Sequence, residues 1–146
     1  MKHLFNIALI ICILATACKS EKNSTKSETA EEQQIPSIEQ VYGGWTIVSI
    51  ENTAINFEAS LEITKGEFSA VICNTMAGKI SQKERRPDAI RLEIELASKR
   101  LCAGEEGDEE THFMNIVPEI RSFAIEGDML KFLDENEKVL MVCKKN

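Results

Sequence analysis

Cysteine is the residue type in this sequence with the widest chemistry. Cys73, Cys102 and Cys143 lie in the body of the chain, while Cys12 and Cys18 lie near its start. Outside the cytoplasm a cysteine pair oxidises readily. Cys73 ends one predicted strand and Cys102 follows another, so we predict a Cys73–Cys102 disulfide, with three buried thiols as the alternative. Cys143 then remains as a buried strand residue or a free thiol.

Catalytic and metal-binding patterns are weak in this sequence. A cysteine nucleophile needs a nearby base, and no spacing places His112 beside a cysteine. Paired cysteines and histidines at zinc-ligand spacing are absent. The acidic run 105–110 lacks the alternating Asp and Asn of a calcium loop, so we predict a solvated loop leading into a helix. We therefore expect no enzymatic activity, no metal and no cofactor.

Three further residues attract attention by type. Asn74 and Gly78 follow Cys73 closely, and both residue types tolerate positive φ. We predict that they shape a tight connection. Trp45 is the single tryptophan, and we assign it to the core, with a binding role as the alternative.

The first 17 residues are typical of an export signal. A short basic start precedes an apolar run over 4–14, and small residues occupy 15–17. The run is shorter than the roughly 20 residues that span a bilayer. With Cys18 directly after it, the segment resembles the lipobox of bacterial lipoproteins, which implies acyl chains on Cys18. The alternative is an ordinary secretory signal in which this cysteine is incidental.

The segment after Cys18 predicts a tether. Residues 18–40 are polar and rich in Ser, Thr, Glu and Lys, so they have little to bury. Lys19 is not the Asp that favours inner-membrane retention in some bacteria. We therefore expect a lipid anchor in the cell envelope, on the outer membrane, with the folded domain over 41–146.

The acidic balance limits the partners of this domain. The chain of 146 residues carries a formal net charge of −7. Binding to nucleic acid needs clustered Lys and Arg, so we expect no nucleic-acid partner. We expect a monomer that contacts the membrane through its lipid, with an unidentified envelope protein as a possible partner.

Apolar residues recur mainly with a period of two, which predicts β-strands. The clearest strand is 89–96, where Ile90, Leu92, Ile94 and Leu96 are expected on one buried face. Other predicted strands cover 42–50, 61–64, 68–73, 121–125, 129–133 and 139–144. The sequence predicts a mainly β fold, a small antiparallel barrel-like or rolled sheet with one short helix, and an α+β arrangement as a variant.

One segment has helical spacing instead. Phe113, Ile116 and Val117 lie at i, i+3 and i+4. Asp108 is the expected N-cap, because its side chain can accept a hydrogen bond from a free N–H of the first turn. Pro118 is expected to end the helix.

Four segments occur in an order that resembles the META domain, the family of the heat-shock protein HslJ. They are GGWTI (43–47), ICNTMAGKI (72–80), SKRLC (98–102) and IEGDMLKF (125–132). Ile72 stands where the family usually has Gly, and Ser98 where it usually has Thr. The resemblance implies a barrel-like fold, an envelope location and an association with stress response. It carries over Cys73, Asn74, Gly78 and Cys102 as signature positions only.

These observations lead to one functional expectation and two alternatives. We expect a non-enzymatic, lipid-anchored envelope binding or stress-response module. The alternatives are an inhibitor of a secreted hydrolase such as a protease or lysozyme, with 74–78 or 103–108 as its contact loop, and a carrier of a small apolar ligand. A core filled by Trp45, Leu92, Ile94 and Phe132 would contradict the carrier.

Overall fold

The structure is a computed structural model that describes residues 36–83 and 85–146. The predicted signal segment, Cys18 and most of the predicted tether lie outside the described residues. Among the described residues, no helix is both long and apolar enough to cross a membrane.

A single antiparallel sheet dominates the described part of the chain. Its strands follow the order β6-β5-β4-β3-β1-β9-β8-β7, and the short β2 pairs with β1. The prediction of a mainly β, rolled antiparallel sheet with one helix is confirmed. The strands are β1 Gly43–Ile50, β2 Thr53–Ala54, β3 Ser60–Thr64, β4 Glu67–Val71, β5 Thr75–Gln82, β6 Ile90–Ala97, β7 Ser122–Glu126, β8 Met129–Leu133 and β9 Val139–Lys145.

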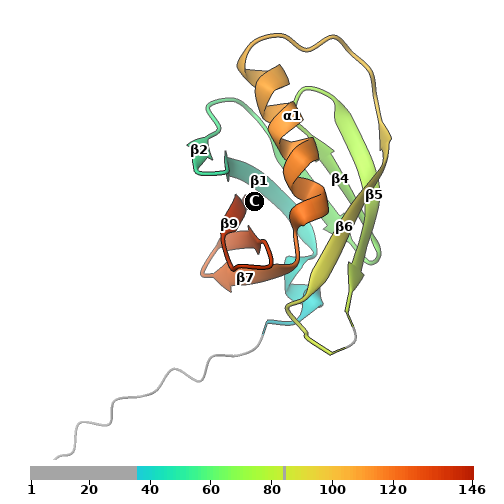
Figure 1. Cartoon of the computed structure of the whole chain (residues 1–146), viewed down its shortest axis with the longest axis vertical. Helices are drawn as coiled ribbons and strands as arrows, with labels where there is room; N and C mark the ends of the chain where they lie inside the picture. The colour runs from blue at the N-terminus through green and yellow to red at the C-terminus, as the bar shows by residue number, and fades with distance from the viewer. Residues whose placement is uncertain (1–35, 84) are drawn as a thin grey trace, which may run out of the picture. The chain divides into compact units, whose positions relative to one another are not determined.

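The sheet curls until its two edge strands meet at one end. Ala89, just before β6, forms an isolated antiparallel bridge with Ser122 in β7. The Ile90 N–H donates to the Arg121 carbonyl at 3.1 Å, which adds to this contact. The helix α1, Glu105–Ile116, lies over the open side of the curl (Figure 1). The result is a half-barrel closed at one end by strand contact and along its side by a helix.

The helix begins earlier than the sequence predicts. Gly104 is its N-cap, and Glu105, Glu106 and Asp108 lie in its first turn. The Asp108 N-cap and the solvated acidic loop are therefore wrong. Acidic side chains stabilise the positive end of a helix dipole, so this run favours the first turn itself. The chain continues through Pro118 in a 3₁₀ turn, η2 Val117–Glu119.

The core lies between the inner face of the sheet and α1. Phe113 and Ile116 of the helix are buried against it, as their spacing predicts. Trp45 is 2% exposed, which confirms its assignment to the core. Its indole Nε1–H donates to the Val41 carbonyl at 2.7 Å. Val41 ends a 3₁₀ turn, η1 Ile38–Val41, which comes before β1.

The predicted buried face of β6 is wrong at its last residue. Ile90 and Leu92 are buried, but Leu96 is 71% exposed. The pairing with β5 shifts register where Gly78 opposes Ile94 and Ala77 opposes Leu96. One extra residue in β6 thus interrupts the alternation, and the following side chain turns to the outer face.

Candidate functional site

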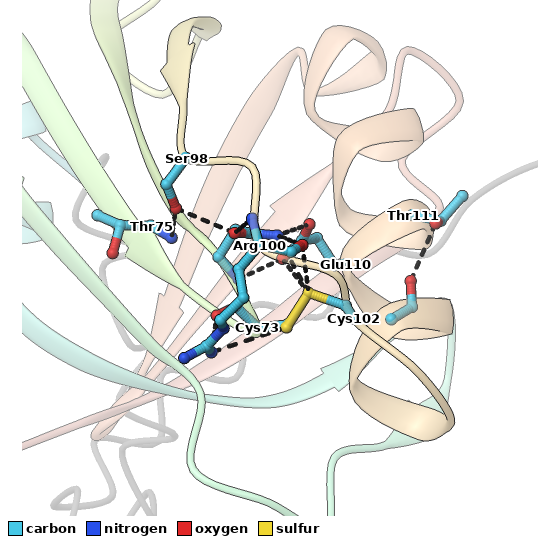
Figure 2. The surroundings of a disulfide bond; sticks show 9 residues. Cys73, Thr75, Ser98, Arg100, Cys102, Glu110 and Thr111 are labelled. Carbon is cyan, nitrogen blue, oxygen red and sulfur yellow. Dashed lines mark hydrogen bonds between the residues drawn. A yellow bond between two sulfur atoms is a disulfide. The ribbon is translucent and has the colours of Figure 1, made fainter.

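A disulfide joins Cys73, which follows β4, to Cys102, which lies between β6 and α1. The two Cα atoms are 6.1 Å apart, so the predicted pair lies at disulfide distance. Figure 2 shows Ser98, Arg100 and Glu110 converging around this bond. Cys143 is a free, buried cysteine in β9, and burial raises the pKa of its thiol.

The buried Asn74 side chain connects the residues around the disulfide. Its Oδ1 accepts hydrogen bonds from the Arg100 backbone N–H at 2.7 Å and from Ser98 Oγ at 3.0 Å. Its Nδ2 donates to the Arg100 carbonyl at 3.1 Å and to Glu110 Oε1 at 2.9 Å. One amide therefore links the β4–β5 turn, the chain segment after β6 and the helix α1.

This role differs from the predicted one. Asn74 is not among the residues with positive φ, so its side chain, rather than its backbone freedom, explains the residue type. The relevant signal in the sequence is an amide that can both donate and accept. The partners lie 24 to 36 residues away along the chain, and no local pattern identifies them.

Glu110 is a buried carboxylate on α1 whose two oxygens have separate donors. The Asn74 backbone N–H donates to Oε2, and the Asn74 amide donates to Oε1. A buried carboxylate needs such hydrogen bonds to offset the loss of water. The Arg100 guanidinium lies nearby, where it donates to the Cys73 carbonyl at 2.5 Å.

Gly78 lies inside β5 rather than in a tight turn, so that prediction is wrong. A Cβ at this position would lie 1.9 Å from the Glu93 carbonyl oxygen in β6. Its φ is not positive. The register shift brings the two backbones together, and only glycine allows this approach.

The segment 98–104 forms an exposed loop fixed at two points. Asn74 holds both backbone groups of Arg100, and the disulfide holds Cys102. Leu101, between these points, is 95% exposed. The contact loops expected for an inhibitor were 74–78 or 103–108. In the structure, 75–78 belongs to β5 and 105–108 to α1.

Two other exposed apolar residues lie on the strands next to this loop. Leu96 is the penultimate residue of β6 and is 71% exposed, and Val71 ends β4 and is 41% exposed. A hollow of about 290 Å³ adjoins Leu96, lined also by Ser69 and Ala77 and by the acidic residues Glu62, Glu67 and Glu95. The loop 98–104 with Val71 and Leu96 is called the apolar rim below.

The chemistry of the cluster favours positioning over catalysis. Ligand atoms of Cys73, Cys102 and Glu110 lie within 4.8 Å of one another. A disulfide sulfur carries no thiolate charge, so the oxidised pair offers no metal ligands. His112 lies apart from this group, with its Nδ1 3.4 Å from Glu109 Oε2. The arrangement can hold a loop rigidly for contact with another molecule.

The fold and cluster define a small half-barrel domain in which a disulfide and a buried amide fix one exposed loop. The META domain model matches residues 38–146. The chain therefore belongs to the META domain family, and the resemblance predicted from the four ordered segments is confirmed.

Solved structures support the fold alone, because their sequence identity is low. A DUF4847 family protein from Bacteroides vulgatus is 12% identical, with a TM-score of 0.54, and the match covers 75% of this chain and 98% of that chain. A protein from Burkholderia xenovorans is also 12% identical, with a TM-score of 0.55, and the match covers 71% and 81%. No curated protein matches the chain.

Proposed function

We propose that this protein is a non-enzymatic, lipid-anchored binding module of the bacterial cell envelope, of the HslJ type within the META family. Its contact surface is the apolar rim. The observation that carries the proposal is the loop 98–104, which is bonded on both sides of Leu101 yet leaves that side chain 95% exposed.

A rigid loop favours binding for a physical reason. Ordering a flexible loop on association costs roughly 0.5–1.5 kcal/mol per immobilised side chain. The bonds of Asn74 and the disulfide impose much of that order before any partner arrives. A disulfide also suits an oxidising compartment outside the cytoplasm, which supports the export and lipidation proposed from residues 1–18.

The two alternative functions differ in support. A hydrolase inhibitor needs a rigid protruding loop, and 98–104 supplies one. A small apolar ligand carrier needs an empty interior, whereas Trp45, Leu92 and Phe132 are buried together in one core cluster. We therefore retain the inhibitor as the second candidate and drop the carrier.

The anchor and the contact surface require separate tests. Fractionation of cells should place the wild-type chain in the outer membrane and Cys18→Ser in the soluble envelope fraction. A photo-crosslinking residue at position 101 should capture one envelope protein. The same residue at position 114 is the matched control, since Met114 is exposed on α1. Equal capture at both positions would contradict a contact surface at the loop.

The stress-response part of the proposal has its own test. Deletion of the gene should reduce survival under envelope stress, and the wild-type copy should restore it. Unchanged survival would contradict a stress role without affecting the binding role.

A further inference from the structure

We propose that the loop 98–104 enters the active-site cleft of a secreted serine peptidase and places Leu101 in an apolar primary-specificity pocket. This inference rests on the binding function proposed above and names its partner class. It assigns the Leu101–Cys102 peptide bond as the bond presented to the peptidase.

The position of Leu101 suits insertion into a pocket. Its side chain is 95% exposed, whereas the next residue, Cys102, is partly buried and covalently fixed. A branched aliphatic side chain that leaves water on entering an apolar pocket favours binding, because its apolar surface is buried. Leu96 and Val71 add apolar surface on the strands beside the loop.

The two sides of the Leu101–Cys102 bond are held independently. On the N-terminal side, the Arg100 N–H and carbonyl both bond Asn74, and the Arg100 guanidinium donates to the Cys73 carbonyl. On the C-terminal side, Cys102 is joined to Cys73 by the disulfide. Both sides are thus attached to the turn between β4 and β5.

This attachment explains why a peptidase would be blocked by the loop. Hydrolysis of the bond adds one water and leaves a carboxylate on Leu101 and an amine on Cys102. Because both ends stay fixed to the body, they remain at a high effective concentration. Resynthesis by the same peptidase, with release of water, then competes with departure of the product. In a flexible loop the two ends formed by hydrolysis would move apart, and the loop would be cleaved as an ordinary substrate.

The inference is tested by changing the pocket preference with one residue. The full-length chain, purified in detergent, is titrated against chymotrypsin, whose pocket is apolar, and trypsin, whose pocket carries an aspartate. We expect stoichiometric inhibition of chymotrypsin by the wild type. Leu101→Lys should weaken that inhibition roughly 100-fold or more, since it places a charge in an apolar pocket, and should create inhibition of trypsin.

A control variant separates the effect of the residue at position 101 from a general effect of added positive charge. Met114→Lys adds the same charge on α1, where Met114 is 39% exposed, and should leave both inhibition profiles unchanged. Asn74→Ala removes both backbone hydrogen bonds that hold Arg100 on the N-terminal side of the bond. It should turn the protein from an inhibitor into a cleaved substrate, seen by mass spectrometry.

Three outcomes would overturn the inference: no inhibition of chymotrypsin, rapid cleavage of the wild type at residue 101, or inhibition that Leu101→Lys leaves unaltered. Its failure is distinguishable from failure of the binding function. Capture of a non-peptidase partner by the crosslinker at position 101, without peptidase inhibition, would retain the binding module and remove the peptidase.

Discussion

Replacement of Asn74 by alanine is the sharpest test of how this domain is held together. The substitution removes four side-chain hydrogen bonds to oxygen or nitrogen partners, which lie on Ser98, both backbone groups of Arg100, and Glu110, and a weaker fifth to Cys102 Sγ. A hydrogen bond contributes about 0.5–1.5 kcal/mol net, and more when the partner is charged. Four bonds therefore predict a loss of roughly 2–6 kcal/mol in the free energy of unfolding.

The solvent exposure of the partners of Asn74 determines where in that range the loss of stability falls. Ser98 and Arg100 are exposed residues, so water can replace part of their bonding. Glu110 is buried, and its carboxylate would lose one donor without easy access to water. We therefore expect a loss of about 3 kcal/mol, dominated by Glu110.

Guanidinium denaturation of the full-length chain, followed by the fluorescence of Trp45, measures this loss. Trp45 is the single tryptophan and is buried, so its signal reports on the core. Asn56→Ala is the matched control, because Asn56 is exposed and its amide bonds Glu105 at 3.2 Å on the surface. That control should change stability by less than about 0.5 kcal/mol. Equal midpoint shifts for the two variants would refute the account of Asn74.

Three further predictions concern the strands and the titrating groups. Gly78→Ala should lower the free energy of unfolding by about 2 kcal/mol or more, since its Cβ would meet the Glu93 carbonyl. The Cys143 thiol should stay unreactive toward a thiol reagent at pH 8 until the protein is denatured, because burial raises its pKa. Hydrogen bonding, mainly from the Lys138 backbone N–H, lowers the pKa of Asp134 below its ordinary value. The Asp134 carboxylate therefore stabilises the fold above that ordinary pKa, and this stabilisation is lost as the pH falls through the lowered pKa. Asp134→Asn should accordingly reduce the loss of stability in acid.

Each of these predictions has a control. Gly66→Ala places a Cβ in open space at a positive φ, so it should cost about 1–2 kcal/mol from backbone strain, with no steric clash added. A Cys143→Ala variant gives the background of the thiol assay. Glu135→Gln removes a neighbouring negative charge in the same turn and controls for the change in net charge. An effect of a control variant as large as that of the tested variant would contradict the corresponding argument.

Much of this fold was predictable from the sequence. The period-two pattern identified most of the long strands, and the spacing of Phe113 and Ile116 identified the helix and its buried face. The order of four short segments identified the family. These signals are visible because strand and helix periods are local, and each is repeated over several residues.

Tertiary structure decided the features that make the candidate site. The extra residue in β6 exposes Leu96 and requires glycine at position 78. Asn74 acquires its role only when segments 24 to 36 residues away reach it. Local periodicity carries no information about such distant partners. The sequence by itself therefore determined the strands, the helix face and the family, whereas the fixed loop around Leu101 depended on contacts that form only in the folded chain.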